Sequence, residues 1–311
     1  MTQRKLEWPM IVQFLSVFID VVLPVFCVVL LAYMVGPRLD LKAQTLSKVA
    51  YYILIPAFTF NMISQADIAF DTVIRMIGFI ATSLLIYALI GFVAARLLKA
   101  SRQMTAAMIM VLVWANIGNF GLALIDFKLG SDALVPATIY FVLVVVFAFI
   151  ICVAAAGWAS GGKMRALWAV FKTPGLIVVA PALLFSTGDI PQPLLLQRVV
   201  GLLGGAMIPV MLLILGLQLA EAGRLKLTRE VAVATMLRLV GGPAVALLVV
   251  NCFGITGLAK ATGILQNSMP VAIIVSIIAV EHGVAPKFVT ATILYSTLFS
   301  LFSLSILLYL M

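Results

Sequence analysis

The sequence predicts an all-α polytopic membrane protein with ten transmembrane helices. Three observations predict it: 64% of the 311 residues are hydrophobic, only 10% are charged, and the mean hydropathy is +1.24. A water-soluble domain of this size cannot bury that much apolar surface, whereas a bundle of lipid-facing helices can expose it. We expect a multi-pass protein of the cytoplasmic (inner) membrane, with the lipid bilayer as its surroundings.

Ten apolar runs reach or approach the roughly 20 residues that cross the hydrocarbon core. No convincing small-residue cleavage site follows the first run, so we interpret it as a retained span. The loops between the runs are short, and backbone at membrane depth must therefore be helical or protected by protein. The runs lie at 16–36, 46–64, 72–96, 104–125, 133–158, 165–187, 194–220, 229–250, 257–280 and 287–310.

Lysine and arginine residues are shared unevenly between the two sides of this array. The odd-numbered loops hold 13 of them, the other side holds six, and Arg238 lies within the eighth run. Because cytoplasmic loops carry the excess of positive charge, the odd loops are predicted to be cytoplasmic and both termini to lie outside. The net charge of +9 therefore comes from basic residues in the loops between membrane spans, and we expect no nucleic-acid partner.

Proline and asparagine residues, which tend to interrupt helices, recur at a nearly constant sequence offset. This recurrence indicates a repeat of residues 1–160 in residues 161–311. Each half holds five runs, so the second half would be inserted upside down relative to the first. Inverted repeats are typical of secondary transporters, whose site lies between the halves near the midplane. The matched pairs are Pro24 and Pro181, Pro56 and Pro209, Asn116 and Asn267, and Pro136 and Pro286, with offsets of 157, 153, 151 and 150 residues.

The fourth and ninth runs contain helix-breaking residues at matching positions. NIGNFG lies within the fourth run and QNSMP within the ninth. Glycine costs a helix interior about 1 kcal/mol and proline about 3 kcal/mol, so both helices are predicted to break and to cross there. We expect Pro270 in the first turn of a restarted helix, with Asn119 and Ser268 as helix caps.

Two restarted helices would point free N–H groups and positive dipole ends into the breaks, which suits a carboxylate. Asn116 and Asn267 would add side-chain donors. Asparagine and glycine also let membrane helices pack closely, but two breaks at matching positions favour a binding site. The predicted substrate-binding residues are Asn116, Gly118, Asn119, Gly121, Asn267, Ser268, Met269 and Pro270.

Two ionisable residues within the runs are candidates for ion coupling or for a structural role. Arg238 lies in the eighth run, where a charge is costly and functional by default. It could bind the substrate anion or hold the broken ninth helix through its free carbonyls, and a structural or coupling role is slightly favoured. Asp20 lies near the start of the first run, where a solvated helix end is favoured over proton coupling. No cofactor or metal site is predicted, and H⁺ or Na⁺ is left open as a coupling ion.

Several segments resemble the auxin efflux carrier family, which includes plant auxin exporters and bacterial malonate or malate carriers. The likeness covers essentially the whole chain. It implies a scaffold of helices 1, 2, 6 and 7, a moving transport unit of helices 3–5 and 8–10, and a homodimer through helices 2 and 7 of the scaffold. The segments are NIGNFGLAL, QNSMPVAIIVSIIAVEHGV, RLVGGPAVAL, IPAFTFNMI and LGLQLA.

Two departures limit what the resemblance implies about the ligand. Only about ten residues join the halves, so the long cytosolic loop of many plant members is missing. Lys172-Thr173-Pro174 stands where many relatives have Asn-Pro, which removes a substrate donor.

The leading interpretation is a secondary active or facilitative carrier of a small organic anion such as malonate, malate or an auxin-like acid. It would work by alternating access of the elevator type. A cation-coupled symporter or exchanger of the bile-acid or sodium–proton antiporter fold is the alternative. The missing carboxylates at mid-depth in the transport unit weigh against it. An enzyme is disfavoured, since there is one histidine and neither H-E-x-x-H nor G-x-S-x-G. A passive channel or sensor stays open.

Overall fold

The computed structural model describes residues 12, 15, 16, 18–66, 69–160, 174–186, 191–221 and 225–311. Within them seven helical segments are long and apolar enough to cross a membrane, and two shorter apolar segments accompany them (Arg102–Val113 and Pro174–Ser186). The chain is therefore an all-helical, multi-span membrane protein. The seven long segments are Phe18–Leu39, Ala43–Ser64, Phe70–Leu97, Ser131–Ser160, Leu194–Glu221, Arg229–Phe253 and Pro286–Leu310.

The first half of the chain follows the predicted runs, with short π-helical or 3₁₀ turns between α-helices. Ser101 caps α6, because its hydroxyl accepts a hydrogen bond from the N–H of Met104 at 3.2 Å. The elements are η1 (Phe18–Val22), α2 (Leu23–Val35), η2 (Pro37–Leu39), α3 (Ala43–Val49), η3 (Ala50–Leu54), α4 (Ile55–Ser64), α5 (Phe70–Leu97), α6 (Arg102–Val113), η4 (Ile117–Gly121), α7 (Leu122–Leu129), η5 (Ser131–Ala133) and α8 (Leu134–Ser160).

The second half repeats this order of helices. Thr228 caps α13 as Ser101 caps α6, its hydroxyl accepting from the N–H of Val231. The sixth predicted run is described only from Pro174 onward. The elements are α9 (Pro174–Ile177), α10 (Val179–Ser186), α11 (Leu194–Gly205), α12 (Met207–Glu221), α13 (Arg229–Val250), η7 (Asn251–Phe253), α14 (Gly257–Asn267), α15 (Ile274–Glu281) and α16 (Pro286–Leu310).

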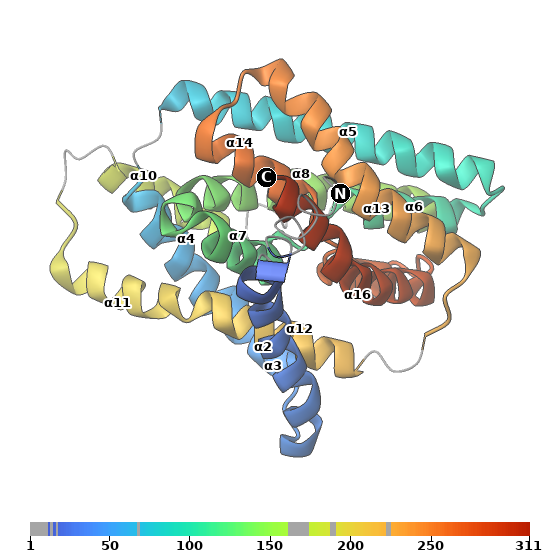
Figure 1. Ribbon diagram of the computed structural model, residues 1–311, viewed down its shortest axis with the longest axis horizontal. Helices are drawn as coiled ribbons and strands as arrows, with labels where there is room; N and C mark the ends of the chain where they lie inside the picture. Colours follow the sequence, from blue (N-terminus) through green and yellow to red (C-terminus); the bar gives the residue numbers. More distant parts are fainter. Residues whose placement is uncertain are drawn as a thin grey trace, which may run out of the picture.

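The helices pack in two sets. In one, α2 and α3 pack against α12, while α4 packs against α10 and α11. In the other, α5, α6 and α8 pack together, and α13 packs against α5, α14 and α16. Figure 1 shows α2, α3, α11 and α12 along one edge of the molecule and α5, α13 and α14 along the opposite edge.

Two close approaches between helices depend on glycine. A Cβ atom at Gly91 of α5 would lie 2.9 Å from the Cα of Ile109 in α6. A Cβ at Gly216 of α12 would collide with the carbonyl of Val29 in α2. Small residues at these contacts bring the helix backbones together, as is usual between membrane helices.

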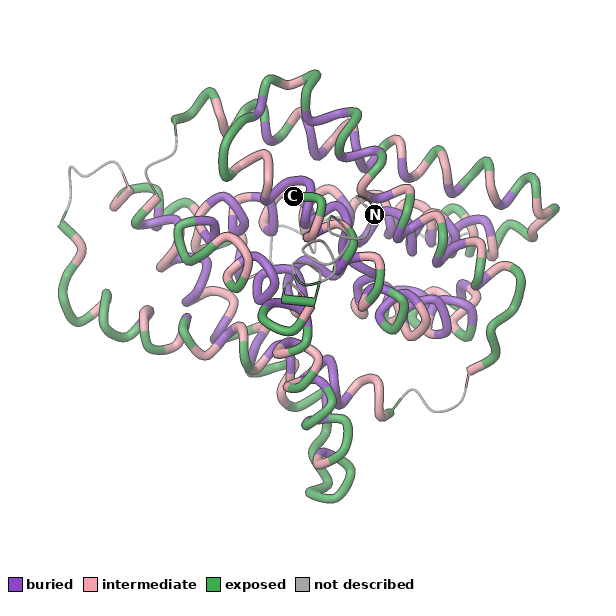
Figure 2. Tube along the Cα trace, in the orientation of Figure 1, coloured by how far each residue is buried: buried purple, intermediate pink, exposed green. Residues whose placement is uncertain are grey.

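Burial places the centre of the bundle at the fourth run. The end of α6 is completely enclosed, with Val111 and Val113 at 0% exposure. Outer helices instead expose large apolar side chains, such as Leu195 (77%) and Leu202 (80%), as expected for lipid-facing surface. Figure 2 shows this contrast between buried central segments and outward-facing turns.

Candidate functional site

The fourth and ninth runs are each broken into two helices at the centre of the molecule. The fourth run is interrupted between α6 and η4 by Trp114–Asn116, and the ninth between α14 and α15 by 268–273. Both breaks are almost wholly buried. Each break therefore needs partners for its backbone groups inside the protein.

The two breaks supply those partners to one another. The N–H of Asn116 donates to the carbonyl of Pro270 at 2.7 Å, and the N–H of Ala272 donates to the carbonyl of Trp114 at 2.9 Å. Ala115 and Val271 thus form an isolated antiparallel β-bridge. The breaks are hydrogen-bonded as a short two-stranded segment between four helix ends.

Three details of the predicted breaks are wrong. Pro270 is not in a first helical turn, because α15 begins at Ile274 and Pro270 pairs with the other break. Asn119 lies inside η4, and no side chain caps that turn. Ser268 does not cap α15 either, since its hydroxyl donates back to the carbonyl of Ile264 at 2.7 Å. The backbone bridge, and not a side-chain cap, satisfies the N–H groups of Asn116 and Ala272 just before the helices restart.

Asn116 is the predicted site residue whose side chain is left without a partner. It is 3% exposed, and its Nδ2 makes no hydrogen bond within the described part of the chain. Burying an amide donor without a partner is costly. A ligand oxygen in the neighbouring cavity would satisfy that donor.

The other predicted residues of the fourth run divide into two kinds. Asn119 and Gly118 line the same cavity as Asn116. Gly118 and Gly121 also make space for packing, since added Cβ atoms would lie 3.0 Å from the ring of Phe141 and 3.2 Å from Cγ of Met269, respectively. The broken part of the fourth run therefore both packs closely against neighbouring side chains and lines the cavity.

The predicted residues of the ninth run face into the protein. Asn267 donates through Nδ2 to the carbonyl of Gly263 at 2.9 Å, and its Oδ1 accepts from the hydroxyl of Tyr87 at 3.2 Å. Ser268 and Met269 are buried. These side chains stabilise the break and do not line the large cavity, to which the ninth run contributes Ala272, Ile273, Ile274 and Ile277.

Arg238 bonds main-chain carbonyls at both breaks. Its Nε donates to Met269 at 2.9 Å, one terminal nitrogen donates to Leu112 at 2.6 Å, and the other donates to Asn267. The guanidinium also lies over the ring of Tyr87, 5.0 Å from its centroid. Of the two roles considered for Arg238, these contacts match carbonyl bonding, and they extend it to the fourth run.

A cavity of about 450 Å³ lies beside the breaks. Its lining is mostly apolar and aromatic, with Asn116 and Asn119 at the broken fourth run. Lys48 is the one charged side chain among the described residues that line it. The other polar side chains of the lining are Gln44, Ser47, Tyr51, Tyr52 and Gln218.

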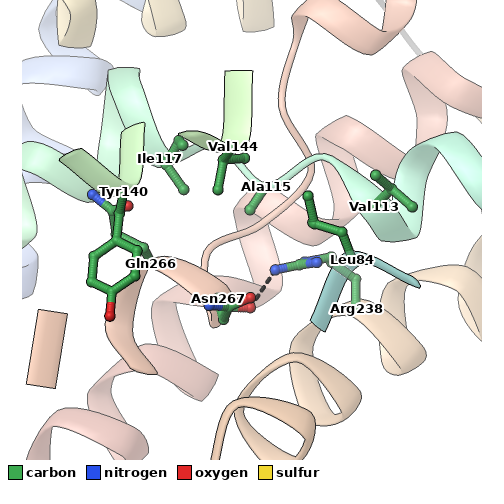
Figure 3. Close-up of a pocket in the computed structure, with 9 residues that line it drawn as sticks. All are labelled: Leu84, Val113, Ala115, Ile117, Tyr140, Val144, Arg238, Gln266 and Asn267. Atoms are coloured by element: carbon green, nitrogen blue, oxygen red, sulfur yellow. Dashed lines mark hydrogen bonds between the residues drawn. The ribbon is translucent and has the colours of Figure 1, made fainter. Parts of the chain in front are cut away.

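A second, very small cavity of about 10 Å³ lies next to Arg238 and Asn267. Figure 3 shows Tyr140 and Gln266 on one side of Asn267 and Arg238 on the other. The Tyr140 hydroxyl and the Gln266 Oε1 have no partner within the described residues. A space of this size holds about one water molecule.

Asp20 lies away from both cavities. It is exposed, and its carboxylate accepts a hydrogen bond from the hydroxyl of Ser16 at 2.7 Å. Neither cavity is lined by it. Asp20 therefore lies at an exposed position in η1, outside both cavities.

Sequence reasoning missed the opposite wall of the large cavity and the ring beneath Arg238. Lys48, Tyr51 and Gln218 come from the second and seventh runs, and Tyr87 from the third. Lys48 carried a usable indication, since it is a charged residue at the start of an apolar run. Nothing in the local sequence around Tyr87 indicates its place.

Comparison with known proteins agrees with this architecture. A family model described as "Membrane transport protein" matches the chain twice, at residues 17–164 and 163–308. A protein of Rhizobium meliloti (strain 1021) named "Putative malonate transporter" is 26% identical over 304 residues, which cover 93% of this chain and 94% of that protein. An "Uncharacterized transporter" of Methanothermobacter thermautotrophicus is 24% identical over 290 residues, covering 92% and 95% of the two chains.

Proposed function

Because the chain belongs to the auxin efflux carrier family of membrane transport proteins, we propose that it is a secondary carrier of a small organic carboxylate. The carboxylate binds in the large cavity, next to the breaks of the fourth and ninth runs. Asn116 and Asn119 donate to it from the fourth run. Asn267 to Pro270 of the ninth run maintain the geometry of the crossing, which is the place where the two breaks meet.

The unpartnered amide of Asn116 carries this proposal. A buried donor on a cavity wall is stabilised when a ligand supplies the acceptor. The helical segment that starts at Ile117 also begins at this cavity, and the positive end of its dipole favours an anion. A hydrogen bond to a charged oxygen is about twice as strong as one between neutral groups.

The cavity lies between two bodies that we infer to move against each other. One wall comes from α3, η3, α9 and α12, which belong to the proposed scaffold (helices 1, 2, 6 and 7). The other comes from η4, α8 and α15 of the proposed transport unit (helices 3–5 and 8–10). A ligand held at such a boundary is carried across when the transport unit slides, as in an elevator.

The proposed topology has ten spans in two inverted halves, residues 1–160 and 161–311, with both termini outside. The double match of the family model and the antiparallel bridge between the breaks support it. With the odd loops in the cytoplasm, Lys48 and Gln218 stand near cytoplasmic helix ends. The cavity then faces the cytoplasm, which makes this the inward-facing state.

The substrate class follows from the lining. One cation, Lys48, and two asparagine amides suit a small acid, and the aromatic and aliphatic walls accept an apolar body. Malonate is a candidate because a relative carries it in its name. Malate and auxin-like acids fit the same donor set.

A homodimer through helices 2 and 7 is part of the proposal. Cβ atoms added at Gly201 and Gly205 of α11 would meet nothing within 4 Å. These glycines are therefore not used for close packing among the described residues, and a second copy could pack there.

Uptake into proteoliposomes tests the carrier. A labelled panel of malonate, malate, succinate, lactate and indole-3-acetate is offered with and without H⁺ and Na⁺ gradients, with protein-free liposomes as the control. Saturable uptake of one acid supports the proposal and its gradient dependence identifies the coupling ion. Ion flux with no acid transported would instead establish a cation exchanger.

A further inference from the structure

Arg238 is a buried cation whose partners are all uncharged. It is 1% exposed, and the described residues place no acidic side chain against it. Its three hydrogen bonds go to carbonyls of Leu112, Asn267 and Met269. An arginine keeps its proton in such a site, so a full positive charge stands at the crossing.

Two of the three carbonyls that Arg238 bonds belong to the negative C-terminal ends of helices. Leu112 lies in the last turn of α6 and Asn267 is the last residue of α14. Each helix C-terminus behaves as roughly −0.5 of a charge, so the two ends together oppose the guanidinium almost completely. The positive charge of Arg238 thereby neutralises the negative partial charges of these two helix ends at the crossing.

No acidic side chain among the described residues that line the large cavity opposes the positive helix ends at the crossing. The helical segment from Ile117 to Leu129 and α15 from Ile274 both begin there, and each N-terminus behaves as roughly +0.5 of a charge. Residues of both starts, Asn116, Gly118, Ile273 and Ile274, line the large cavity, whereas Arg238 does not. The buried, unpartnered Nδ2 of Asn116 lies at the same place.

We propose that Arg238 is a positioning residue that sets the charge of the substrate site without touching the substrate. It cancels the two negative helix ends, so that the two positive ends select an anionic carboxylate over a neutral molecule of the same shape. This inference rests on the proposed function, because it concerns the same cavity. The measurement that tests it is how strongly the Kd of a ligand depends on the charge of that ligand.

Binding of each acid is compared with that of its neutral amide on detergent-solubilised protein, by the ligand-induced shift of thermal unfolding. The pairs are malonate with malonamide, succinate with succinamide, lactate with lactamide and indole-3-acetate with indole-3-acetamide. The wild type is expected to bind one acid at least about tenfold more tightly than its amide. Equal binding of acid and amide would overturn the inference.

Two substitutions at Arg238 separate charge from shape. Arg238→Lys keeps the charge but replaces the planar guanidinium with one compact ammonium group, which cannot reproduce the three bonds in the same geometry. It should keep the acid's Kd within about threefold. Arg238→Gln keeps polar donors but loses the charge, and it should weaken the acid about tenfold while leaving the amide unchanged. Equal loss in both variants would mean that geometry alone matters, which contradicts the inference.

Lys128→Gln is the matched control, since Lys128 Nζ donates to the carbonyl of Leu308 at the end of α16, at 2.9 Å. It removes a cation from a helix C-terminus elsewhere and should leave the acid's Kd unchanged. Should Arg238→Gln fail to fold, the acid–amide comparison in the wild type and Arg238→Lys still decides. If no acid binds or is transported by the wild type, the proposed function has failed, which is a different result from unchanged binding in Arg238→Gln.

Discussion

The N–H of Asn116 donates to the carbonyl of Pro270 at 2.7 Å, across 154 residues of sequence. Together with the bond from Ala272 to Trp114, it pairs backbone groups that two broken helices would otherwise bury unsatisfied in the membrane. The two breaks therefore stabilise each other. Because the backbone is satisfied from within, the side chain of Asn116 is left available to a ligand.

Asn116→Ala should weaken ligand binding without destabilising the protein. The amide Nδ2 has no hydrogen-bond partner among the described residues, so its removal breaks none of the hydrogen bonds that they make. A hydrogen bond to a charged oxygen is worth roughly 1.5–3 kcal/mol, so the acid's Kd should rise about tenfold or more. Isothermal titration with the transported acid measures this. Asn251→Ala, at an exposed asparagine, is the control, and an unchanged Kd in Asn116→Ala would remove Asn116 from the site.

Gly242→Ala should damage the crossing, whereas Gly241→Ala should not. A Cβ at Gly242 would lie 2.5 Å from the carbonyl oxygen of Asn267, but one at Gly241 meets nothing within 4 Å. Overpacking of this kind costs about 1–3 kcal/mol, while alanine in an open helical position stabilises slightly. Thermal unfolding in detergent and uptake in liposomes check both. Normal stability and uptake in Gly242→Ala would show that the crossing tolerates a shift of the ninth run.

Ser47→Cys should react with a membrane-impermeant maleimide added from the cytoplasmic side only. Ser47 lines the large cavity, and the proposed topology opens that cavity to the cytoplasm. The substitution is made after replacing Cys27 and Cys252 with serine and Cys152 with alanine. Transported acid should slow the labelling.

Ser131→Cys is the matched control for that experiment. Ser131 is exposed in the turn before α8, which the proposed topology places outside. It should react only from the outer side. Labelling of both cysteines from the same side would contradict the inverted topology.

Glu221→Ala should loosen the contact between α3 and α12. The Glu221 carboxylate accepts a hydrogen bond from the N–H of Ala43 at 3.0 Å, which satisfies a free donor at the start of α3. Loss of such a cap costs about 1 kcal/mol. Glu221→Gln keeps an acceptor oxygen and should lose less. Equal unfolding temperatures for wild type and Glu221→Ala would show that water replaces the carboxylate at no cost.

Helix positions were predictable because lipid imposes a local rule. Each apolar run had to be helical, and Pro, Gly and Asn marked where helices start, end or break. The break of the fourth run was displaced, since Trp114–Asn116 lie outside any helix and pair with the ninth run while Ile117–Gly121 form a π-helical turn. Local propensity indicates a weak point in a helix, but the pairing partner decides which residues extend.

Side-chain roles at the crossing were harder to predict because they depend on distant chain segments. Asn119 and Ser268 were expected to cap helices, but the opposite break supplies the hydrogen bonds. Arg238 could be recognised as unusual from its depth alone. That it reaches Leu112, 126 residues away, follows only from the packing of α13 against α6.

The most direct measurement is saturable uptake of a labelled carboxylate into proteoliposomes that contain wild-type protein or Asn116→Ala at equal density. We expect saturable uptake by the wild type and at least a tenfold lower initial rate in the variant at subsaturating acid. Equal uptake by both proteins would contradict the assignment of the carboxylate to the broken helices.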